Sequence, residues 1–342
     1  MRPAASLAKL RIAATAILVV AVLAVADLRQ TLKIEGEAFW ADRRCINIGN
    51  RLEAPREGEW GGPLDISVFP ALRTAGFNTI RLPVRWDTHT GPPPAFPIDP
   101  AYLARVQEVV GAALDADLAV VLNVHHFDPL YAEPERYAPQ FLAIWQQIAD
   151  HFAAADARLA LELINEPRAP LEGKALEALQ AQAHRRIRER HPERWIMVTG
   201  GDWSTIHGLK ALRFHGDQRT VLTFHDYAPF DFTHQGAHWA PPDIQKVTRS
   251  WPQSRDREDV KARMNTARTL KQRFHRPVFL GEFGAIQGAE GRDAYLEAVR
   301  DAAEAHGIGW CVWSLTADFG VFDAASGRLV PEAQTALGLG RR

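Results

Sequence analysis

The sequence is poor in cysteine and has no excess of charge of either sign. Only Cys45 and Cys311 occur in 342 residues, so disulfides cannot be the scaffold, and no Cys-x-x-Cys pair suggests a zinc site. We predict that both cysteines are buried strand residues, with a bridge between them as the alternative. The 40 basic and 41 acidic side chains give a formal net charge of −1. No global basic field therefore exists to attract nucleic acid or acidic lipid.

The N-terminus carries an apolar run that is short for a membrane span. The run "IAATAILVVAVLAVA" follows three basic residues and ends in an Ala-x-Ala pattern at residues 24–26, whereas a span needs roughly 20 apolar residues. This order predicts a signal peptide over residues 1–26, with an uncleaved anchor as the alternative. We expect residues 27–342 to be exported to the periplasm or the medium. They would be held at a membrane only if the segment stays uncleaved.

The body of the chain has no internal repeat, no Gly/Ser-rich linker and no Gly-rich phosphate fingerprint after its first strand. Instead, short apolar runs of β type alternate with longer segments of helical period, such as 101–117 and 138–155. The expected strands are 44–50, 77–83, 118–126, 158–165, 194–200, 220–227, 276–284 and 309–315. Eight nearly continuous apolar strands separated by helices predict an α/β fold, a single-domain (β/α)₈ TIM barrel over residues 27–342. A doubly wound open sheet is the alternative.

Most of these strands end on polar or aromatic residues. The residues at these ends are Asn50, Arg81, His125, Asn165 with Glu166, His225 with Tyr227, Glu282 and Trp313. In a barrel all carboxyl ends of the strands lie on one face, which is where barrel enzymes build their active sites. The pattern therefore predicts one converging site rather than several unrelated loops.

Two of these ends carry the carboxylates that glycosidic hydrolysis requires. That reaction needs one carboxyl group that holds a proton and one that is ionised, on either side of the anomeric carbon. Glu166 ends the fourth predicted strand and Glu282 ends the seventh, within "FLGEFG". Strands four and seven lie on roughly opposite walls of an eight-stranded barrel, so these two side chains would face each other.

The chain resembles glycoside hydrolase family 5, the large cellulase family. The stretches 46–61, 80–86, 120–126, 225–239 and 279–285 occur in family order and are most similar to the bacterial branch acting on β-1,4-glucans and, in some members, β-mannans. The resemblance covers about residues 35–325. It implies that Glu282 is the nucleophile of a retaining mechanism and Glu166 the acid/base.

The resemblance also implies supporting roles for four residues. Arg81 would keep Glu282 ionised, although Glu162 is an alternative partner for its guanidinium. Tyr227 would donate a hydrogen bond to the nucleophile, His225 would hold Glu166, and Asn165 would bind the sugar 2-hydroxyl.

Further residues are expected along the sugar-binding cleft. They are His125, His126, Trp313, Asn50, Glu53, His234 and Trp239. Aromatic faces suit the apolar C–H faces of sugars. His125 and His126 are adjacent in a predicted strand and should point to opposite faces, which argues against a metal site. Asp226 stands where relatives commonly have an aromatic residue and should add a charge near the mouth.

These expectations converge on an enzyme that cleaves internal β-1,4 bonds of cellulose-type glucan, or of glucomannan or mannan, without a metal or organic cofactor. We expect a monomer whose partner is the polysaccharide. A non-catalytic carbohydrate-binding barrel is one alternative, and a metal-dependent barrel hydrolase that uses His125, His126 and a distant acid is another.

Overall fold

The structure is a computed structural model and describes residues 36–340 of the chain. The expected signal peptide, residues 1–26, lies outside these residues. From Trp40 onward the chain forms one compact unit. Within the described part of the chain, no helix has both the length and the apolar composition that crossing a membrane requires.

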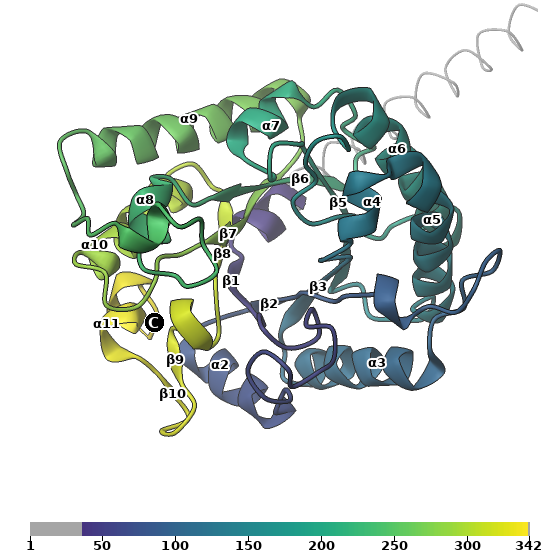
Figure 1. The fold of residues 1–342 in the computed structure, drawn as a ribbon, viewed down its shortest axis with the longest axis horizontal. Coiled ribbons are helices and arrows are strands. Elements are labelled where there is room, and N and C mark those ends of the chain that lie inside the picture. Colours follow the sequence, from purple (N-terminus) through teal and green to yellow (C-terminus); the bar gives the residue numbers. More distant parts are fainter. Residues whose placement is uncertain (1–35, 341–342) are drawn as a thin grey trace, which may run out of the picture. The chain divides into compact units, whose positions relative to one another are not determined.

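Eight parallel strands close into a barrel in chain order, with β1 pairing both β2 and β8 (Figure 1). The predicted (β/α)₈ barrel is confirmed, and the alternative of an open sheet is wrong. The barrel strands are β1 (Arg44–Asn47), β2 (Thr79–Leu82), β3 (Ala119–Asn123), β4 (Leu159–Glu162), β5 (Ile196–Thr199), β6 (Thr220–Asp226), β7 (Val278–Phe283) and β8 (Gly309–Val312). A short antiparallel pair follows, β9 (Phe322–Asp323) with β10 (Arg328–Leu329).

Helices surround the barrel and cover the outer face of its strands (Figure 1). They are α2 (Phe69–Ala75), α3 (Pro100–Asp115), α4 (Asp128–Ala132), α5 (Pro134–His151), α6 (Gly173–Arg190), α7 (Ile206–Ala211), α8 (Phe230–Thr233), α9 (Asp256–Phe274), α10 (Arg292–Glu304) and α11 (Pro331–Ala336). Because helices cover the barrel strands, the outward-facing residues of these strands are apolar as well.

Local sequence signals set where these helices begin. Pro100 stands in the first turn of α3, where a missing N–H costs nothing, and the side chain of Asp99 accepts a hydrogen bond from the backbone of Ala101. Helix α9 has three acidic residues in its first turn and Lys271 and Arg273 in its last turn, which suits the helix dipole.

An aromatic cluster packs at the amino ends of the strands. Trp40 packs edge-on against Trp195, with ring centroids 6.0 Å apart, and against Phe279, at 5.5 Å. All three side chains are buried. This end of the barrel is therefore filled with apolar side chains, and the chemistry-bearing residues lie at the other end.

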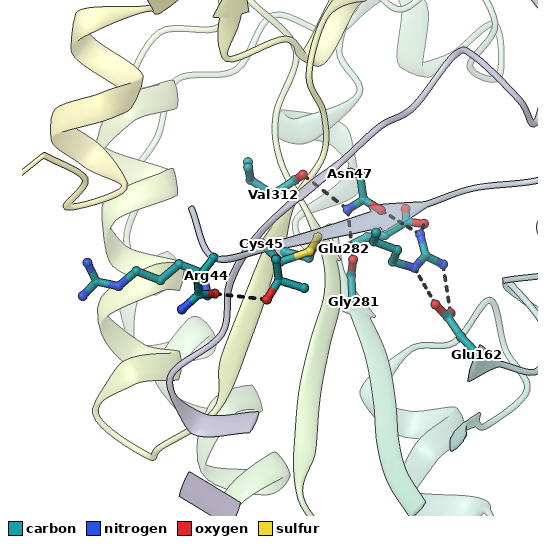
Figure 2. Close-up of a disulfide and its surroundings, with 11 residues drawn as sticks. Arg44, Cys45, Asn47, Glu162, Gly281, Glu282 and Val312 are labelled. Atoms are coloured by element: carbon teal, nitrogen blue, oxygen red, sulfur yellow. Dashed lines mark hydrogen bonds and ion pairs between the residues drawn. A yellow bond between two sulfur atoms is a disulfide. The ribbon is translucent and has the colours of Figure 1, made fainter. Parts of the chain in front are cut away.

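The two cysteines form a disulfide between the first and last strands of the barrel (Figure 2). Cys45 in β1 and Cys311 in β8 are direct partners in the strand register. Both cysteines are buried strand residues, as predicted, and the alternative of a bridge between them also holds. The two residues are 266 positions apart in sequence, and only closure of the barrel brings them side by side.

Candidate active site

Arg81 is buried inside the barrel, and all three nitrogens of its guanidinium donate hydrogen bonds. It forms ion pairs with both Glu162 and Glu282, each with a closest N–O distance of 2.6 Å. It also donates to Asn47 Oδ1 at 2.9 Å and to Asn165 Oδ1 at 2.7 Å. The two partners considered for Arg81 from the sequence are thus both correct. Two buried carboxylates share one buried cation, which satisfies its fork of donors.

Asn47 lies in the neighbouring strand β1, opposite Arg81 in the register, and fixes this arrangement. Its Nδ2 donates to the carbonyl oxygens of Gly281, at 3.0 Å, and Val312, at 3.3 Å, while its Oδ1 accepts from Arg81 (Figure 2). One amide therefore joins β1, β7 and β8 to the arginine of β2. Asn165 has its Oδ1 on Arg81, so its amide nitrogen is turned away from the guanidinium and is available as a donor.

Glu282 receives donors on both carboxylate oxygens. Arg81 holds Oε1, and the Tyr227 hydroxyl donates to Oε2 at 2.9 Å. Burial raises the pKa of Glu282 above its usual value, while His225, Arg81 and the Tyr227 hydroxyl act in the opposite direction. Arg81 therefore favours the ionised form as expected, but it acts against a larger effect of burial.

Glu166 follows β4 in a loop and has a different set of partners. Its backbone has a positive φ of 43°, and its Oε1 lies 2.9 Å from His225 Nδ1, as expected. Burial raises the pKa of Glu166 to about 7, against the opposing charges of Arg81 and Arg168. A carboxyl group with this pKa holds a proton near neutral pH.

The two glutamates lie close together across the mouth. One carboxylate oxygen of each and a ring nitrogen of His225 all lie within 4.8 Å of one another. Retaining glycosidases place their carboxyl groups about 5–5.5 Å apart, whereas inverting ones leave about 6.5–9.5 Å for a water molecule. Carboxylate oxygens this close match the shorter, retaining separation.

His125 and His126 point to the same side, which corrects the predicted alternation. Their ring centroids are only 4.7 Å apart. The alternation of side chains does not apply to them, because β3 already ends at Asn123. His125 stacks against Trp313 at 5.7 Å with an interplanar angle of 10°, and His126 meets Trp60 edge-on at 5.6 Å. Burial lowers the pKa of both rings, that of His126 to about 4, so both are neutral.

A cleft of about 690 Å³ opens beside Trp313. It is lined by Asn50, Trp60, His126, His238, Trp239, Trp313, Ala317, Asp318 and Phe319. Trp239 is 53% exposed and its indole N–H donates to Asp318, while Trp60 is 42% exposed. Trp313 covers the backbone of Gly49, where a Cβ atom would lie 2.9 Å from the indole ring. Exposed aromatic faces in a polar cleft suit sugar rings.

Two predicted cleft residues lie beneath this surface instead. Glu53 is 1% exposed, and its carboxylate accepts hydrogen bonds from the backbone N–H groups of Asn50 and Arg51. It holds the loop that presents Asn50 and is not placed to bind sugar. His234 is also buried. Its ring stacks on Phe230 at 4.0 Å and meets Trp239 edge-on at 5.3 Å, so it packs behind Trp239 and supports that side chain.

Asp226 does not add a charge near the mouth. Its carboxylate is buried on Arg263, at 2.8 and 3.0 Å, and accepts from the backbone of Ala228. It is next to His225 in β6, so the two side chains lie on opposite faces of the strand.

The sequence model of the family described as cellulase, or glycosyl hydrolase family 5, matches residues 45–319. The chain belongs to this family. Its closed barrel is the fold that the sequence motifs led us to expect.

Similar proteins include bacterial endoglucanases. Endoglucanase H of Acetivibrio thermocellus is 31% identical over 278 residues, which cover 81% of this chain and 29% of that protein. The chain thus spans less than a third of that relative. A solved hyperthermophilic endo-β-1,4-glucanase in complex with substrate is 32% identical with a TM-score of 0.85, over 89% of this chain and 99% of that one. Thermotoga maritima Cel5A in complex with mannotriose has the same identity and TM-score, over 88% and 99%.

Trp203 is an exposed aromatic residue that no sequence motif pointed to. Trp203 is 51% exposed and lies in a run of three residues, 202–204, that all have positive φ. The guanidinium of Arg168 lies 4.1 Å from its ring centroid, and the neighbouring Ser204 accepts a hydrogen bond from the backbone of Glu166. The left-handed turn therefore presents a tryptophan beside Glu166. Trp60, Asp318 and Phe319 were also missed, since nothing distinguishes them from packing or loop residues in sequence.

Glu166, His225 and Glu282 are close enough to surround a cation. However, Glu282 already accepts from Arg81 and Tyr227, and the guanidinium would repel a metal ion at this point. These contacts disfavour a cation at this point. His125 and His126, the ligands of the metal-dependent alternative, are not part of this group.

Proposed function

We propose that the chain hydrolyses internal β-1,4 bonds of a glucan by double displacement, with Glu282 as nucleophile and Glu166 as acid/base. The observation that carries this proposal is the spacing of the two glutamates together with their different partners. The short separation supports retention of configuration. Relatives named as endo-β-1,4-glucanases support the substrate class and the endo action.

In the first step, a Glu282 oxygen attacks the anomeric carbon while the bond to the leaving oxygen breaks. Glu166, protonated near neutral pH, gives its proton to that oxygen. In the second step, Glu166 takes a proton from water, whose oxygen attacks the same carbon and releases Glu282. Arg81 and Tyr227 stabilise the Glu282 carboxylate when it is released.

The neighbouring residues would bind the polysaccharide. The amide nitrogen of Asn165 is proposed to donate to the 2-hydroxyl next to the cleaved bond, a contact that strengthens in the transition state. Trp313, Trp60 and Trp239 would stack on successive sugar rings in the cleft, with His125, His126 and Asn50 offering polar contacts. Because a relative was solved with mannotriose, mannan and glucomannan are proposed as further substrates.

Residues 27–342 are proposed as the catalytic domain of an exported monomer that needs no cofactor and binds no nucleic acid. The charged and apolar order of residues 1–26 supports export, and similar proteins include bacterial endoglucanases. Any membrane attachment would come from that N-terminal segment.

The proposal is tested with purified protein and its Glu282→Gln and Glu166→Gln variants. Reducing-sugar release is measured from cellulosic glucan, glucomannan and mannan, and the configuration of the first product is followed by NMR. We expect activity with retention in the wild type and none with Glu282→Gln. Glu166→Gln should form the glycosyl-enzyme only from aryl glycosides whose leaving group needs no acid.

Two results would contradict the proposal. Binding of glycans without cleavage by the wild type would indicate a non-catalytic carbohydrate-binding barrel. Loss of cleavage in a strong chelator, restored by a divalent metal, would indicate the metal-dependent alternative.

A further inference from the structure

Two buried polar atoms, one of His225 and one of Thr223, have no hydrogen-bond partner in the described part of the chain. His225 Nδ1 lies 2.9 Å from Glu166 and 3.7 Å from Glu282. Its Nε2 is fully buried and has no hydrogen-bond partner among the described residues, and the same is true of Thr223 Oγ1. Buried polar atoms are nearly always partnered, so two orphans near one another need an explanation.

Gly281 shows how near these atoms are. A Cβ atom placed on Gly281 would lie 2.8 Å from Thr223 Oγ1 and 3.2 Å from His225 Nε2. Both atoms therefore face the same small space, which the missing side chain of Gly281 leaves open. Thr223 and His225 are two residues apart in β6, with a register shift between Phe224 and His225. One buried water molecule, or a small shift of the Thr223 side chain, would connect them.

The surrounding charges give this contact a direction. Burial lowers the pKa of His225 to about 4, so the ring is neutral and carries one proton. Carboxyl oxygens of both Glu166 and Glu282 face Nδ1 and can accept a hydrogen bond, which places that proton on Nδ1. Nε2 is then an acceptor, and a threonine hydroxyl can donate to it.

We propose that Thr223 is a positioning residue. Its hydroxyl donates to His225 Nε2, directly or through one buried water molecule, and so holds the imidazole in the Nδ1–H tautomer that donates to Glu166. The inference rests on the proposed role of Glu166 as acid/base. A donor on Glu166 stabilises its ionised form, so Thr223 would lower the pKa of Glu166 without touching it.

Other groups that face Glu166 are unchanged by a substitution at Thr223. They are Arg81 from β2, Glu162 from β4, Arg168 from the loop after β4, Glu282 from β7 and Tyr227 from the end of β6. A change in the titration of Glu166 in a Thr223 variant therefore comes through His225.

The test compares Thr223→Val, which keeps the shape but removes the hydroxyl, with Thr223→Ser, which keeps the hydroxyl. Thr199→Val is the matched control, because Thr199 is a buried barrel threonine on the neighbouring strand whose hydroxyl donates to the backbone of Thr223. The readouts are the ¹⁵N NMR signals of the His225 ring and the pH profile of kcat on a soluble β-glucan.

In the wild type we expect a protonated Nδ1 and a hydrogen-bonded acceptor at Nε2. Thr223→Val should change the Nε2 signal, lower kcat about three- to tenfold and raise the alkaline limb of the profile by about half to one pH unit, the effect of one ordinary hydrogen bond. Thr223→Ser should restore both readouts. Thr199→Val should leave both where they are in the wild type.

A protonated Nε2 in the wild type would overturn the inference, and this measurement needs no variant to fold. A Thr223→Val profile that matches that of Thr199→Val would also overturn it. The NMR readout does not depend on turnover. If Glu166→Gln and Glu282→Gln kept full activity, the proposed function would fail, and the NMR result would still decide the tautomer.

Discussion

Replacing Tyr227 with phenylalanine tests what keeps the proposed nucleophile ionised. The Tyr227 hydroxyl donates to Glu282 Oε2 at 2.9 Å, while Arg81 holds the other oxygen. Burial already raises the pKa of Glu282. Removing one of the donors that oppose this effect should therefore raise that pKa further.

The expected rise in pKa follows from the kind of hydrogen bond. A hydrogen bond to a charged group contributes about 1.5–3 kcal/mol, and one pKa unit corresponds to about 1.36 kcal/mol. We therefore expect the pKa of Glu282 to rise by about one to two units in Tyr227→Phe. Since Glu282 must be ionised to attack, the acid limb of the kcat/KM profile should move to higher pH by this amount.

The assay is kcat/KM for a soluble β-glucan across the pH range. Below the acid limb the variant should be about 10- to 100-fold less active than the wild type, because each pH unit by which the limb moves costs about a factor of ten there. The matched control is Tyr295→Phe, which also removes a buried tyrosine hydroxyl, one that donates to the backbone of Asp226 at 3.1 Å. Its acid limb should match that of the wild type. An unmoved acid limb in Tyr227→Phe would refute the reasoning, because the hydroxyl would then contribute nothing to the ionised state.

Three further changes have expected outcomes. Replacing both Cys45 and Cys311 with alanine should lower the melting temperature by several degrees. The bridge closes a loop of 266 residues and stabilises the fold by up to about 5 kcal/mol, because it restricts the unfolded chain. Calorimetry measures the change, and an unchanged melting temperature would contradict the prediction. Trp239→Ala should raise KM for long glucans by up to about tenfold, because a stacked aromatic contributes about 0.5–1.5 kcal/mol. The effect on a short aryl glycoside should be smaller, and equal effects on both substrates would remove Trp239 from the outer cleft. Arg81→Lys should reduce kcat by at least about a hundredfold, since one ammonium group cannot donate to Glu162, Glu282 and Asn165 at once. A kcat near that of the wild type would show that the positive charge alone suffices.

The barrel could be predicted from sequence because its strands carry a strong local signal. A strand such as "VFLGEF" in β7 is buried along its whole length, and eight such runs separated by helices allow few architectures. The ends of the strands were predicted less well. β3 was expected to reach 126 but ends at Asn123, and this difference reversed the inferred orientation of His126.

The cleft could be predicted only in part, because contacts across the barrel have no local signature. Nothing in the sequence around Glu53 distinguishes a carboxylate that binds sugar from one that accepts from its own loop. The disulfide depends on the register between β1 and β8, which exists only after closure. Trp203 is presented by backbone in the left-handed region, which short sequence patterns without glycine rarely reveal.

The two glutamates of this site have different donors. Glu282 accepts from a guanidinium and a phenol hydroxyl, both of which favour its ionised form. Glu166 has on its carboxylate the imidazole of His225, which burial keeps neutral. A charged donor stabilises a carboxylate more strongly than a neutral one does. Two residues of the same type in one barrel mouth can therefore take the opposite roles of nucleophile and acid, and exchanging their donors should exchange their order of titration.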